Sequence, residues 1–295
     1  MPVNSRIMSN SDGHITWREL MASTAEVLND APMARWLCEH ASGLDAEEFV
    51  AELDELVNAR SGIHLDAMVR RVLDGEPVQY VMGRWAFRYL DLMIDQRVLI
   101  PRPETELMVD VVLRHVGASK GPFTMADLGT GSGAVGLSLL HELPLNSTTV
   151  WMTDISTDAI DVARANAAGI GRPAAGARFE VGSWWDALPS DVAGLFDVVV
   201  SNPPYIARGD AEVESSVNDW EPHSALFSGD DGLDDIRIIA ADAPQWLRSG
   251  GLLVVEMGYT QASAVTSLMS AAGFIDVTVH HDLAGHDRFV SGVKP

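Results

Sequence analysis

Apolar residues in the first quarter of the chain recur with the spacing of an α-helix. The segment 64–75 carries five of them at this spacing: Leu65, Met68, Val69, Val72 and Leu73. Such spacing gathers the side chains on one helix face. Thr16 with Glu19, and Asp45 with Glu48, have the residue types of capping boxes, which begin helices. Because each helix is apolar on one face only, the pattern predicts a small domain of mutually packed helices over residues 1–77.

The pattern changes in the segment 78–100, VQYVMGRWAFRYLDLMIDQRVLI. This segment is rich in aromatic and β-branched residues and alternates weakly between apolar and polar ones, which is typical of paired strands. We therefore expect a β-hairpin linker over residues 78–101. Pro103 follows it and can begin a helix.

From residue 102 to the end, β-branched runs alternate with helical patterns. The expected strands are Phe123–Leu128, Thr148–Thr153, Ala177–Val181, Phe196–Ser201, Gly251–Glu256, Asp276–His280 and Arg288–Gly292. The expected helices are Glu104–Val116, Ala134–Glu142, Thr157–Ala168, Asp234–Leu247 and Thr260–Ala272. This alternation predicts an α/β domain over residues 102–295, with a mostly parallel, doubly wound sheet. The last two strands have no helix between them, which favours an antiparallel pair at one edge.

The charge of the chain narrows the possible functions. Among 295 residues, 42 acidic and 20 basic side chains give a formal net charge of −22. Proteins that grip duplex nucleic acid normally neutralise phosphates with Lys and Arg, so direct nucleic-acid binding is not expected. No run of about 18 apolar residues occurs, so we expect no membrane span. Residues 1–14 lack the apolar core of a secretory signal, and Cys38 is the single cysteine, so we expect a cytoplasmic protein.

The stretch MADLGTGSGAVGLSLL lies between an expected strand and an expected helix. Gly129, Gly131 and Gly133 allow the backbone to turn tightly and to approach a ligand closely. Asp154 ends the next strand, where a carboxylate can accept hydrogen bonds from both ribose hydroxyls. This order of strand, loop, helix, strand and acid indicates a site for an adenosine compound. Because Gly129-x-Gly131-x-x-Ala134 also partly fits the dinucleotide fingerprint, the loop alone leaves a nicotinamide cofactor open.

Asp127 stands just before the glycine loop and bears on this choice. An acid beside a pyrophosphate would repel it. S-adenosyl-L-methionine instead carries a sulfonium and an ammonium group and has no phosphate. Asp127 therefore favours this methyl donor, with S-adenosyl-L-homocysteine as the product.

The stretch Asn202-Pro203-Pro204-Tyr205 follows the expected strand Phe196–Ser201. Two adjacent prolines cannot continue a sheet, and strand ends in open parallel sheets line the ligand crevice. The Asn202 side-chain oxygen and the Pro203 carbonyl can orient a planar nitrogen toward a methyl group and stabilise the positive charge that grows on it. Tyr205 can stack on a flat acceptor. We therefore expect Asn202, Pro203 and Tyr205 to be catalytic residues of a methyltransferase.

These motifs make the chain similar to a known family. Asn-Pro-Pro-Tyr after the fourth strand is a mark of S-adenosylmethionine-dependent methyltransferases that act on planar nitrogens. Along nearly its whole length, the chain resembles more closely the bacterial peptide chain release factor N5-glutamine methyltransferases. The segments that carry the likeness are GEPVQYVMG (75–83), LIPRPETE (99–106), DLGTGSGA (127–134), SNPPYI (201–206), EPHSAL (221–226) and DLAGHDR (282–288).

The resemblance implies a Rossmann-like class I methyltransferase sheet, preceded by a helical domain that recognises the substrate. It implies methylation of the glutamine in the Gly-Gly-Gln motif of peptide chain release factors, which gives N5-methylglutamine. The residues that it implies for donor binding are Gly129, Thr130, Gly131, Ser132, Gly133, Asp154, Trp184 and Asn202. The residues that it implies for the glutamine are Asn202, Pro203, Pro204 and Tyr205.

In the stretch VGSWWDAL (181–188), the resemblance places the aromatic contact to the donor on Trp184, with Trp185 as the neighbouring alternative. Many relatives carry an Asp just before this aromatic residue, and Ser183 takes that place here. One contact to the adenine that the family pattern would supply is therefore open in this chain.

Four other functions remain open from the sequence. Rival methyl acceptors are a ribosomal-protein glutamine, which the intact Arg-Pro-Glu-Thr-Glu run disfavours, and an exocyclic amino group of DNA or RNA, which the net charge disfavours. A nicotinamide oxidoreductase and a non-catalytic binding module are the other two.

His280, His281 and His286 cluster near the C-terminus, but their spacing is more typical of a surface turn than of a metal site, so no metal is expected.

Overall fold

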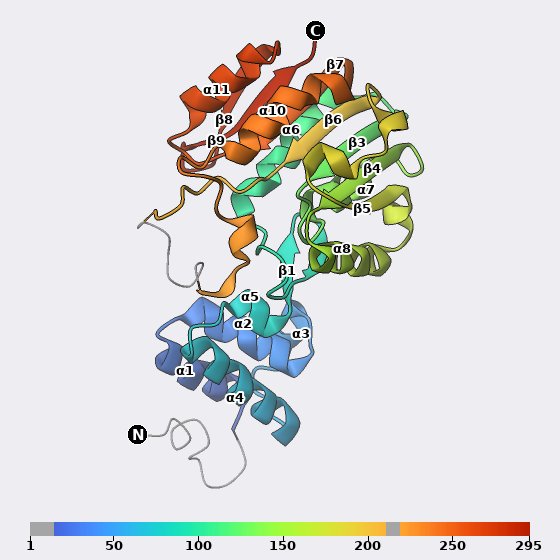
Figure 1. Cartoon of the computed structure of the whole chain (residues 1–295). Helices are drawn as coiled ribbons and strands as arrows, with labels where there is room; N and C mark the ends of the chain where they lie inside the picture. The colour runs from blue at the N-terminus through green and yellow to red at the C-terminus, as the bar shows by residue number, and fades with distance from the viewer. Residues whose placement is uncertain (1–14, 211–218) are drawn as a thin grey trace. The chain divides into compact units, whose positions relative to one another are not determined.

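Two compact units, Met1–Gly83 and Arg84–Pro295, make up the computed structural model. It describes residues 15–210 and 219–295 (Figure 1). The segment in which we found no secretory signal, residues 1–14, lies outside the described residues. Among the helices of the described part of the chain, none has both the length and the apolar character that a membrane crossing needs.

The first unit consists of helices, as the apolar spacing predicted. Their bounds are α1 Trp17–Leu28, α2 Ala31–Ser42, α3 Ala46–Ala51, α4 Ala59–Leu73 and α5 Val78–Met82. Both expected capping boxes are present: the Thr16 hydroxyl accepts from the Glu19 N–H, and the Asp45 carboxylate accepts from the Glu48 N–H. The apolar faces of the helices meet in a shared core, which includes the free cysteine Cys38.

The start of the expected hairpin differs from the prediction. We expected strand structure from Val78 onward, and the chain instead forms the short helix α5. Pro77 precedes this helix, and Gly83 ends it with a left-handed φ of 70°. These two helix-end residues outweigh the strand preference of the β-branched and aromatic residues between them. The hairpin begins only after Gly83, where β1 Arg84–Phe87 pairs antiparallel with β2 Leu90–Met93 in the second unit.

A seven-stranded sheet organises the second unit. The strand bounds are β3 Phe123–Leu128, β4 Thr148–Asp154, β5 Ala177–Val181, β6 Phe196–Ser201, β7 Leu247–Glu256, β8 Ile275–His281 and β9 Asp287–Val293. The strands lie in the order β5-β4-β3-β6-β7-β9-β8. Neighbours from β5 to β7 are parallel, and β9 pairs antiparallel with both β7 and β8. The expected α/β sheet and its antiparallel edge pair are thus confirmed.

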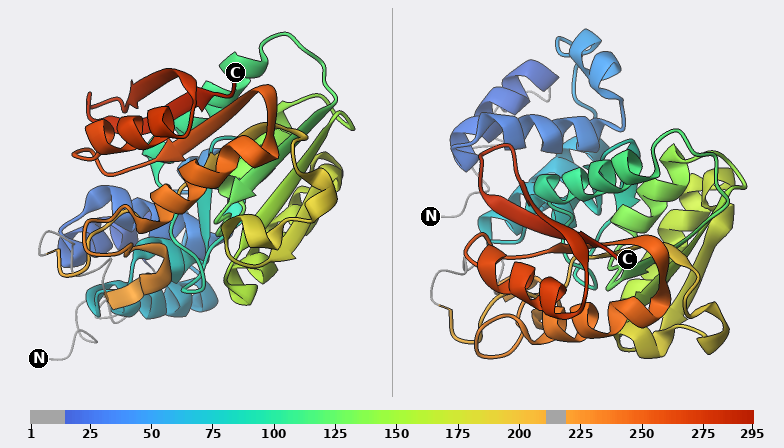
Figure 2. Two further views of the ribbon diagram at one scale, coloured as in Figure 1. Left: turned by 45° about the horizontal axis from the view of Figure 1, so that its top comes forward. Right: turned by 90° about the horizontal axis from the view of Figure 1, so that it is seen from above.

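Helices cover both faces of this sheet (Figure 2). The longer ones are α6 Glu106–Val116, α7 Ala134–Glu142, α8 Thr157–Ile170, α10 Asp234–Trp246 and α11 Ala262–Ala271. Short 3₁₀ turns are η2 Pro103–Thr105, η3 Arg172–Gly176, η4 Trp184–Ala187, η5 Ser190–Val192 and η6 His223–Ala225. Helices α6, α7 and α8 lie on one face, and α10 and α11 on the other. The chain proceeds from β3 toward one edge and from β6 toward the other, so the ligand crevice is expected where these two strands end.

Candidate active site

Three neighbouring parallel strands end at the same level of the sheet. Leu128, the last residue of β3, pairs with Thr153 in β4 and with Ser201 in β6. The groups that follow along the three strands are therefore neighbours in space: the glycine loop after β3, Asp154 at the end of β4, and Asn202 after β6. The topology alone thus brings together the donor and acceptor motifs that the sequence singled out.

The glycine loop, residues 129–133, is fixed by its own N–H groups. Those of Gly129 and Thr130 both donate to the Thr153 carbonyl, each at 2.9 Å. The Gly131 N–H donates to Asp154 Oδ2 at 3.0 Å. Gly131 has a φ of +54°, and a Cβ built on it would meet no atom within 4 Å. A left-handed residue with open space above it is a position where the backbone itself can contact a ligand.

Asp127 holds the glycine loop in place through hydrogen bonds to its side chain. Its side chain is 3% exposed, and its Oδ2 accepts from Thr130 Oγ1 at 2.6 Å and from the Gly136 N–H at 2.9 Å. Burial raises the pKa of this carboxyl to about 6. Asp127 therefore ties the loop to the first turn of α7, while it also faces the cavity described below.

Asp154 is positioned by two backbone donors. Its Oδ2 accepts from Gly131, and its Oδ1 accepts from the Ser156 N–H at 2.9 Å. Burial raises the pKa of this carboxyl above its ordinary value. Each carboxylate oxygen has two lone-pair sites, so both oxygens keep capacity for a further donor. That capacity suits the pair of ribose hydroxyls expected from the sequence.

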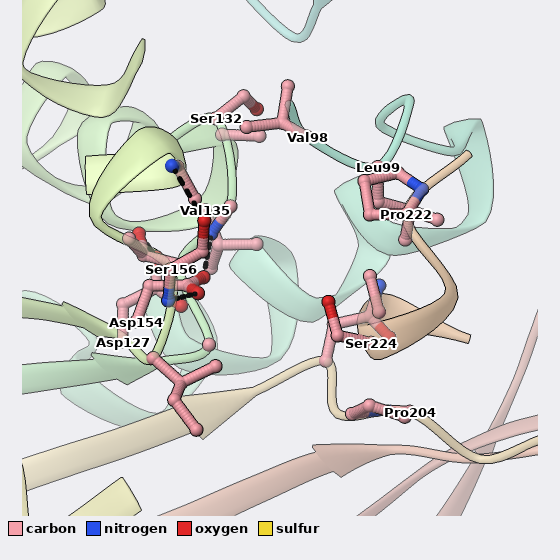
Figure 3. Close-up of a pocket in the computed structure, with 18 of the residues that line it drawn as sticks. Val98, Leu99, Asp127, Ser132, Val135, Asp154, Ser156, Pro204, Pro222 and Ser224 are labelled. Carbon is pink, nitrogen blue, oxygen red and sulfur yellow. Dashed lines mark hydrogen bonds between the residues drawn. The ribbon is translucent and has the colours of Figure 1, made fainter. Parts of the chain in front are cut away.

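A cavity of about 260 Å³ lies over these strand ends. Asp154 and Ser156 line it on one side, and Leu99, Pro222 and Ser224 lie across from them (Figure 3). Residues of two segments that are distant in the sequence, 97–101 and 222–225, line the cavity. Leu99 and Pro101 belong to the motif LIPRPETE, and the segment 222–225 belongs to EPHSAL, two of the motifs that carried the family resemblance.

Glu221 holds these two segments together. Its carboxylate is buried, accepts from the Ile100 N–H at 3.1 Å, and pairs with Arg102 Nη2 at 2.5 Å. Loss of Arg102 would leave a buried carboxylate without its cation, which is strongly destabilising. Glu106 belongs to LIPRPETE, the motif that also contains Arg102. Its carboxylate accepts from the Arg88 N–H at 2.9 Å and so stabilises the turn of the hairpin.

The Asn-Pro-Pro-Tyr residues divide into two groups around the cavity. Asn202 and Pro204 line it, whereas buried Pro203 and half-buried Tyr205 are not among the described residues that do. The Tyr205 carbonyl accepts from Gln261 Nε2 at 3.0 Å, and its ring packs against the core of the sheet. Burial and the charge of a nearby carboxylate raise the pKa of its hydroxyl. The catalytic roles expected for Pro203 and Tyr205 stay predictions.

The two adjacent tryptophans have different surroundings. Trp185 is buried in the core, where it stacks on Trp246. Trp184 lines the cavity, has a φ of +44°, and donates from Nε1 to Asp235 Oδ1 at 3.0 Å. A Cβ on Gly129 would meet its ring at 3.2 Å, so the ring lies against the glycine loop. Of the two, Trp184 is the one placed to contact a ligand.

Comparisons with known proteins agree with this geometry. Residues 105–218 match the family model described as "Methyltransferase small domain", and residues 17–83 match "PrmC N-terminal domain". The release factor glutamine methyltransferase of Burkholderia pseudomallei is 41% identical over 281 residues, which cover 93% of this chain and 97% of that protein. The chain belongs to the release factor glutamine methyltransferase family.

Further comparisons extend this result. The release factor glutamine methyltransferase of Xylella fastidiosa (strain Temecula1) is 39% identical over 262 residues, covering 89% of this chain and 92% of that protein. Among solved structures, the hMettl16 catalytic domain in complex with an RNA hairpin superposes with a TM-score of 0.54 at 15% identity, covering 79% of this chain and 81% of that chain. That likeness concerns the fold alone. The chain therefore has the expected class I methyltransferase sheet. Because it belongs to a family of methyltransferases, the two other functions left open by the sequence, a nicotinamide oxidoreductase and a non-catalytic binding module, are excluded.

Asn166 is a residue of this methyltransferase that the sequence did not single out. From α8, its Oδ1 accepts from the Met93 N–H at 2.7 Å, and its Nδ2 donates to the Met93 carbonyl at 3.1 Å and to the Ser132 carbonyl at 2.9 Å. It therefore links the β-hairpin to the glycine loop. A helix interior is an unfavourable place for Asn, and that is the one signal that could have revealed it.

The histidines near the C-terminus of this methyltransferase have ordinary partners. His280 Nε2 lies 2.8 Å from Ser291 Oγ, and His281 Nδ1 lies 2.8 Å from Asp287. Within residues 15–210 and 219–295, no group of three His, Cys, Asp or Glu side chains has the arrangement of metal ligands. Nothing about these histidines connects them to the cavity.

A first prediction concerns the support of Trp184. Asp235→Ala is expected to weaken S-adenosylmethionine binding about threefold to tenfold, because the indole N–H loses its acceptor and the ring is no longer held against Gly129. Calorimetric titration measures the change. The matched control is Asp234→Ala, since Asp234 is the preceding residue of α10 and pairs with exposed Arg237. Equal dissociation constants for the two variants would show that the position of Trp184 does not matter to the donor.

Proposed function

We propose that this methyltransferase transfers a methyl group from S-adenosyl-L-methionine to the side-chain amide nitrogen of the glutamine in the Gly-Gly-Gln motif of peptide chain release factors. The products would be N5-methylglutamine and S-adenosyl-L-homocysteine. One observation carries the proposal: Asn202 and Pro204 line the same cavity as Gly131 and Asp154. An amide suited to orient a planar nitrogen thus lies beside a loop suited to an adenosine compound. The names of the relatives support the choice of acceptor.

The residues of the cavity fit S-adenosylmethionine. Gly131 leaves open the space that a Cβ would fill, and Asp154 keeps lone pairs for ribose hydroxyls. Asp127 adds a second acid at the cavity, and this one is buried; a second acid suits a cationic donor better than a pyrophosphate. Trp184 offers an aromatic ring on the same wall. When bound, the donor supplies an electrophilic methyl group carried on a sulfonium.

Asn202 would orient the acceptor. The nitrogen of a glutamine amide is a poor nucleophile because its lone pair is delocalised into the carbonyl. Asn202 Oδ1 would accept one of its N–H groups and the Pro203 carbonyl the other, so that the nitrogen faces the methyl and its growing positive charge is stabilised. Pro203 and Pro204 restrict the backbone of this segment, so little conformational entropy is lost when the acceptor binds. The proton leaves the nitrogen after transfer, so no general base is needed while the bond forms.

The macromolecular partner in this proposal is a release factor. A net charge of −22 argues against a nucleic-acid acceptor, because few basic side chains are available to neutralise phosphates. The helical unit, whose residues 17–83 match the PrmC N-terminal domain, is our candidate for recognising the protein substrate. Release factors act on ribosomes, so we place the enzyme in the cytoplasm.

Mass spectrometry tests the proposed function. A release factor made without methylation is incubated with the enzyme and S-adenosylmethionine, and the peptide that contains Gly-Gly-Gln is then analysed. We expect this glutamine to gain one methyl group. A release factor with the glutamine replaced by alanine is the control, and its peptide should stay unmodified. If the wild-type peptide also stays unmodified while the donor binds, the acceptor is wrong, and ribosomal proteins and nucleic-acid amino groups become the next candidates.

A further inference from the structure

Asn202 contacts a chain of buried polar groups, and the first of them, Thr105, also lines the cavity. Asn202 Nδ2 is 3.5 Å from Thr105 Oγ1, and Thr105 Oγ1 donates to Glu256 Oε2 at 2.7 Å. Thr105 is 3% exposed and Glu256 is 2% exposed. The three residues come from different elements: Asn202 follows β6, Thr105 ends η2, and Glu256 ends β7. None of the expected site residues other than Asn202 belongs to this chain of contacts.

The direction of these hydrogen bonds is set by the carboxylate. A charged Glu256 can only accept, so the single hydroxyl proton of Thr105 is committed to it. The lone pairs of Thr105 Oγ1 are then left for Asn202 and require a donor there. The only donor in the Asn202 side chain is its NH₂ group. The amide nitrogen therefore faces Thr105, and Oδ1 is left to face the cavity.

We propose that Thr105 and Glu256 are positioning residues that fix the orientation of the Asn202 amide. The inference deepens the proposed function and rests on it, because it assumes that Asn202 Oδ1 accepts from the acceptor amide. An asparagine amide has nearly the same shape after a half-turn, so sterics alone do not choose between its two orientations. In the wrong one, the NH₂ group of Asn202 would meet the N–H of the substrate. The hydroxyl of Thr105 removes that possibility by accepting from the nitrogen.

The surroundings of Glu256 allow a test with pH. Arg288 from β9, Arg102 and Glu104 from the segment before α6, and Tyr205 after β6 are the charged or titratable groups that act on it. Burial raises the pKa of Glu256 to about 7. Below that pH the protonated carboxyl can donate to Thr105, whose hydroxyl is then free to donate to Asn202 Oδ1. The orienting effect is thus present above pH 7 and is lost as the pH falls through this value.

Three variants of the full-length enzyme test the proposal. Thr105→Val keeps the shape and removes the hydroxyl, and at pH 8 it is expected to lower kcat for release factor methylation about tenfold. Thr105→Ser keeps the hydroxyl and is expected to recover most of that loss. Thr148→Val is the matched control, because Thr148 is also a buried threonine and lies at the start of β4, at the opposite end from the cavity. The dissociation constant for S-adenosylmethionine should stay within about twofold in all of them.

The pH profile separates positioning from a structural role. Between pH 8 and pH 6 the ratio of wild-type kcat to Thr105→Val kcat should shrink toward one, because protonated Glu256 no longer orients Asn202 in the wild type. A ratio that stays constant, or a Thr105→Ser variant as slow as Thr105→Val, would overturn the proposal. A wild-type enzyme that binds the donor and methylates no release factor would instead refute the proposed function. The two failures are therefore distinguishable.

Discussion

Asn202→Ala is expected to lower kcat for release factor methylation by about 10²–10³-fold, with the dissociation constant for S-adenosylmethionine changed less than about threefold. The size of the effect follows from the loss of one preorganised group that acts on the charge developing in the transition state. Asn202 is half-buried and lines the cavity, so its truncation leaves a space that water can fill. We therefore expect the folded state to lose little stability.

Single-turnover kinetics at saturating donor, together with calorimetric donor titration, would measure this effect. The control is Pro204→Ala, which changes a neighbouring residue of the cavity wall and removes no polar side chain. Pro204→Ala is expected to lower kcat far less than Asn202→Ala does. If Asn202→Ala weakened donor binding and left kcat unchanged, Asn202 would be a donor-binding residue only, and the acceptor would have to be oriented by other groups.

The sheet was predictable from the sequence because its strands are marked locally. The runs Phe123–Leu128 and Phe196–Ser201 are apolar and β-branched, and the structure has strands with these same bounds. Two errors arose at the ends of elements. Strand β7 begins at Leu247 rather than Gly251, and α5 replaces the first residues of the expected hairpin between two helix-end residues. In the case of α5, the local helix-end signals of Pro77 and Gly83 outweighed the strand preference of the residues between them.

The candidate site was predictable where one motif follows one strand. The glycine loop, Asp154 and Asn202 each end a recognisable strand, and the parallel register then brings them together. The contacts that hold them were not predictable. Thr105 and Glu256 are 151 residues apart in the chain, and Arg102 and Glu221 are 119 apart. No periodicity relates such pairs, and a lone glutamate at a strand end does not reveal that it is buried.

The glycine loop yields the second large effect, a loss of donor binding in Gly131→Ala. The Cβ would enter space that is open in the structure and that lines the cavity, so it would compete with the donor rather than with the protein. Overpacking of this kind costs about 1–3 kcal/mol, so we expect the dissociation constant for S-adenosylmethionine to rise roughly fivefold to 150-fold. Calorimetric titration measures it.

Gly131→Ala also strains the backbone, because Gly131 has a φ of +54° and a left-handed conformation costs about 1–2 kcal/mol in residues with a Cβ. Gly273→Ala is the matched control for this effect. Gly273 also has a positive φ, +91°, with no atom within 4 Å of a built Cβ, and it does not line the cavity. Urea unfolding should therefore show a similar loss of stability in both variants, whereas only Gly131→Ala should bind S-adenosylmethionine more weakly. If both variants bound the donor as weakly as each other, the loss would come from general destabilisation, and the loop would not be the surface that contacts S-adenosylmethionine.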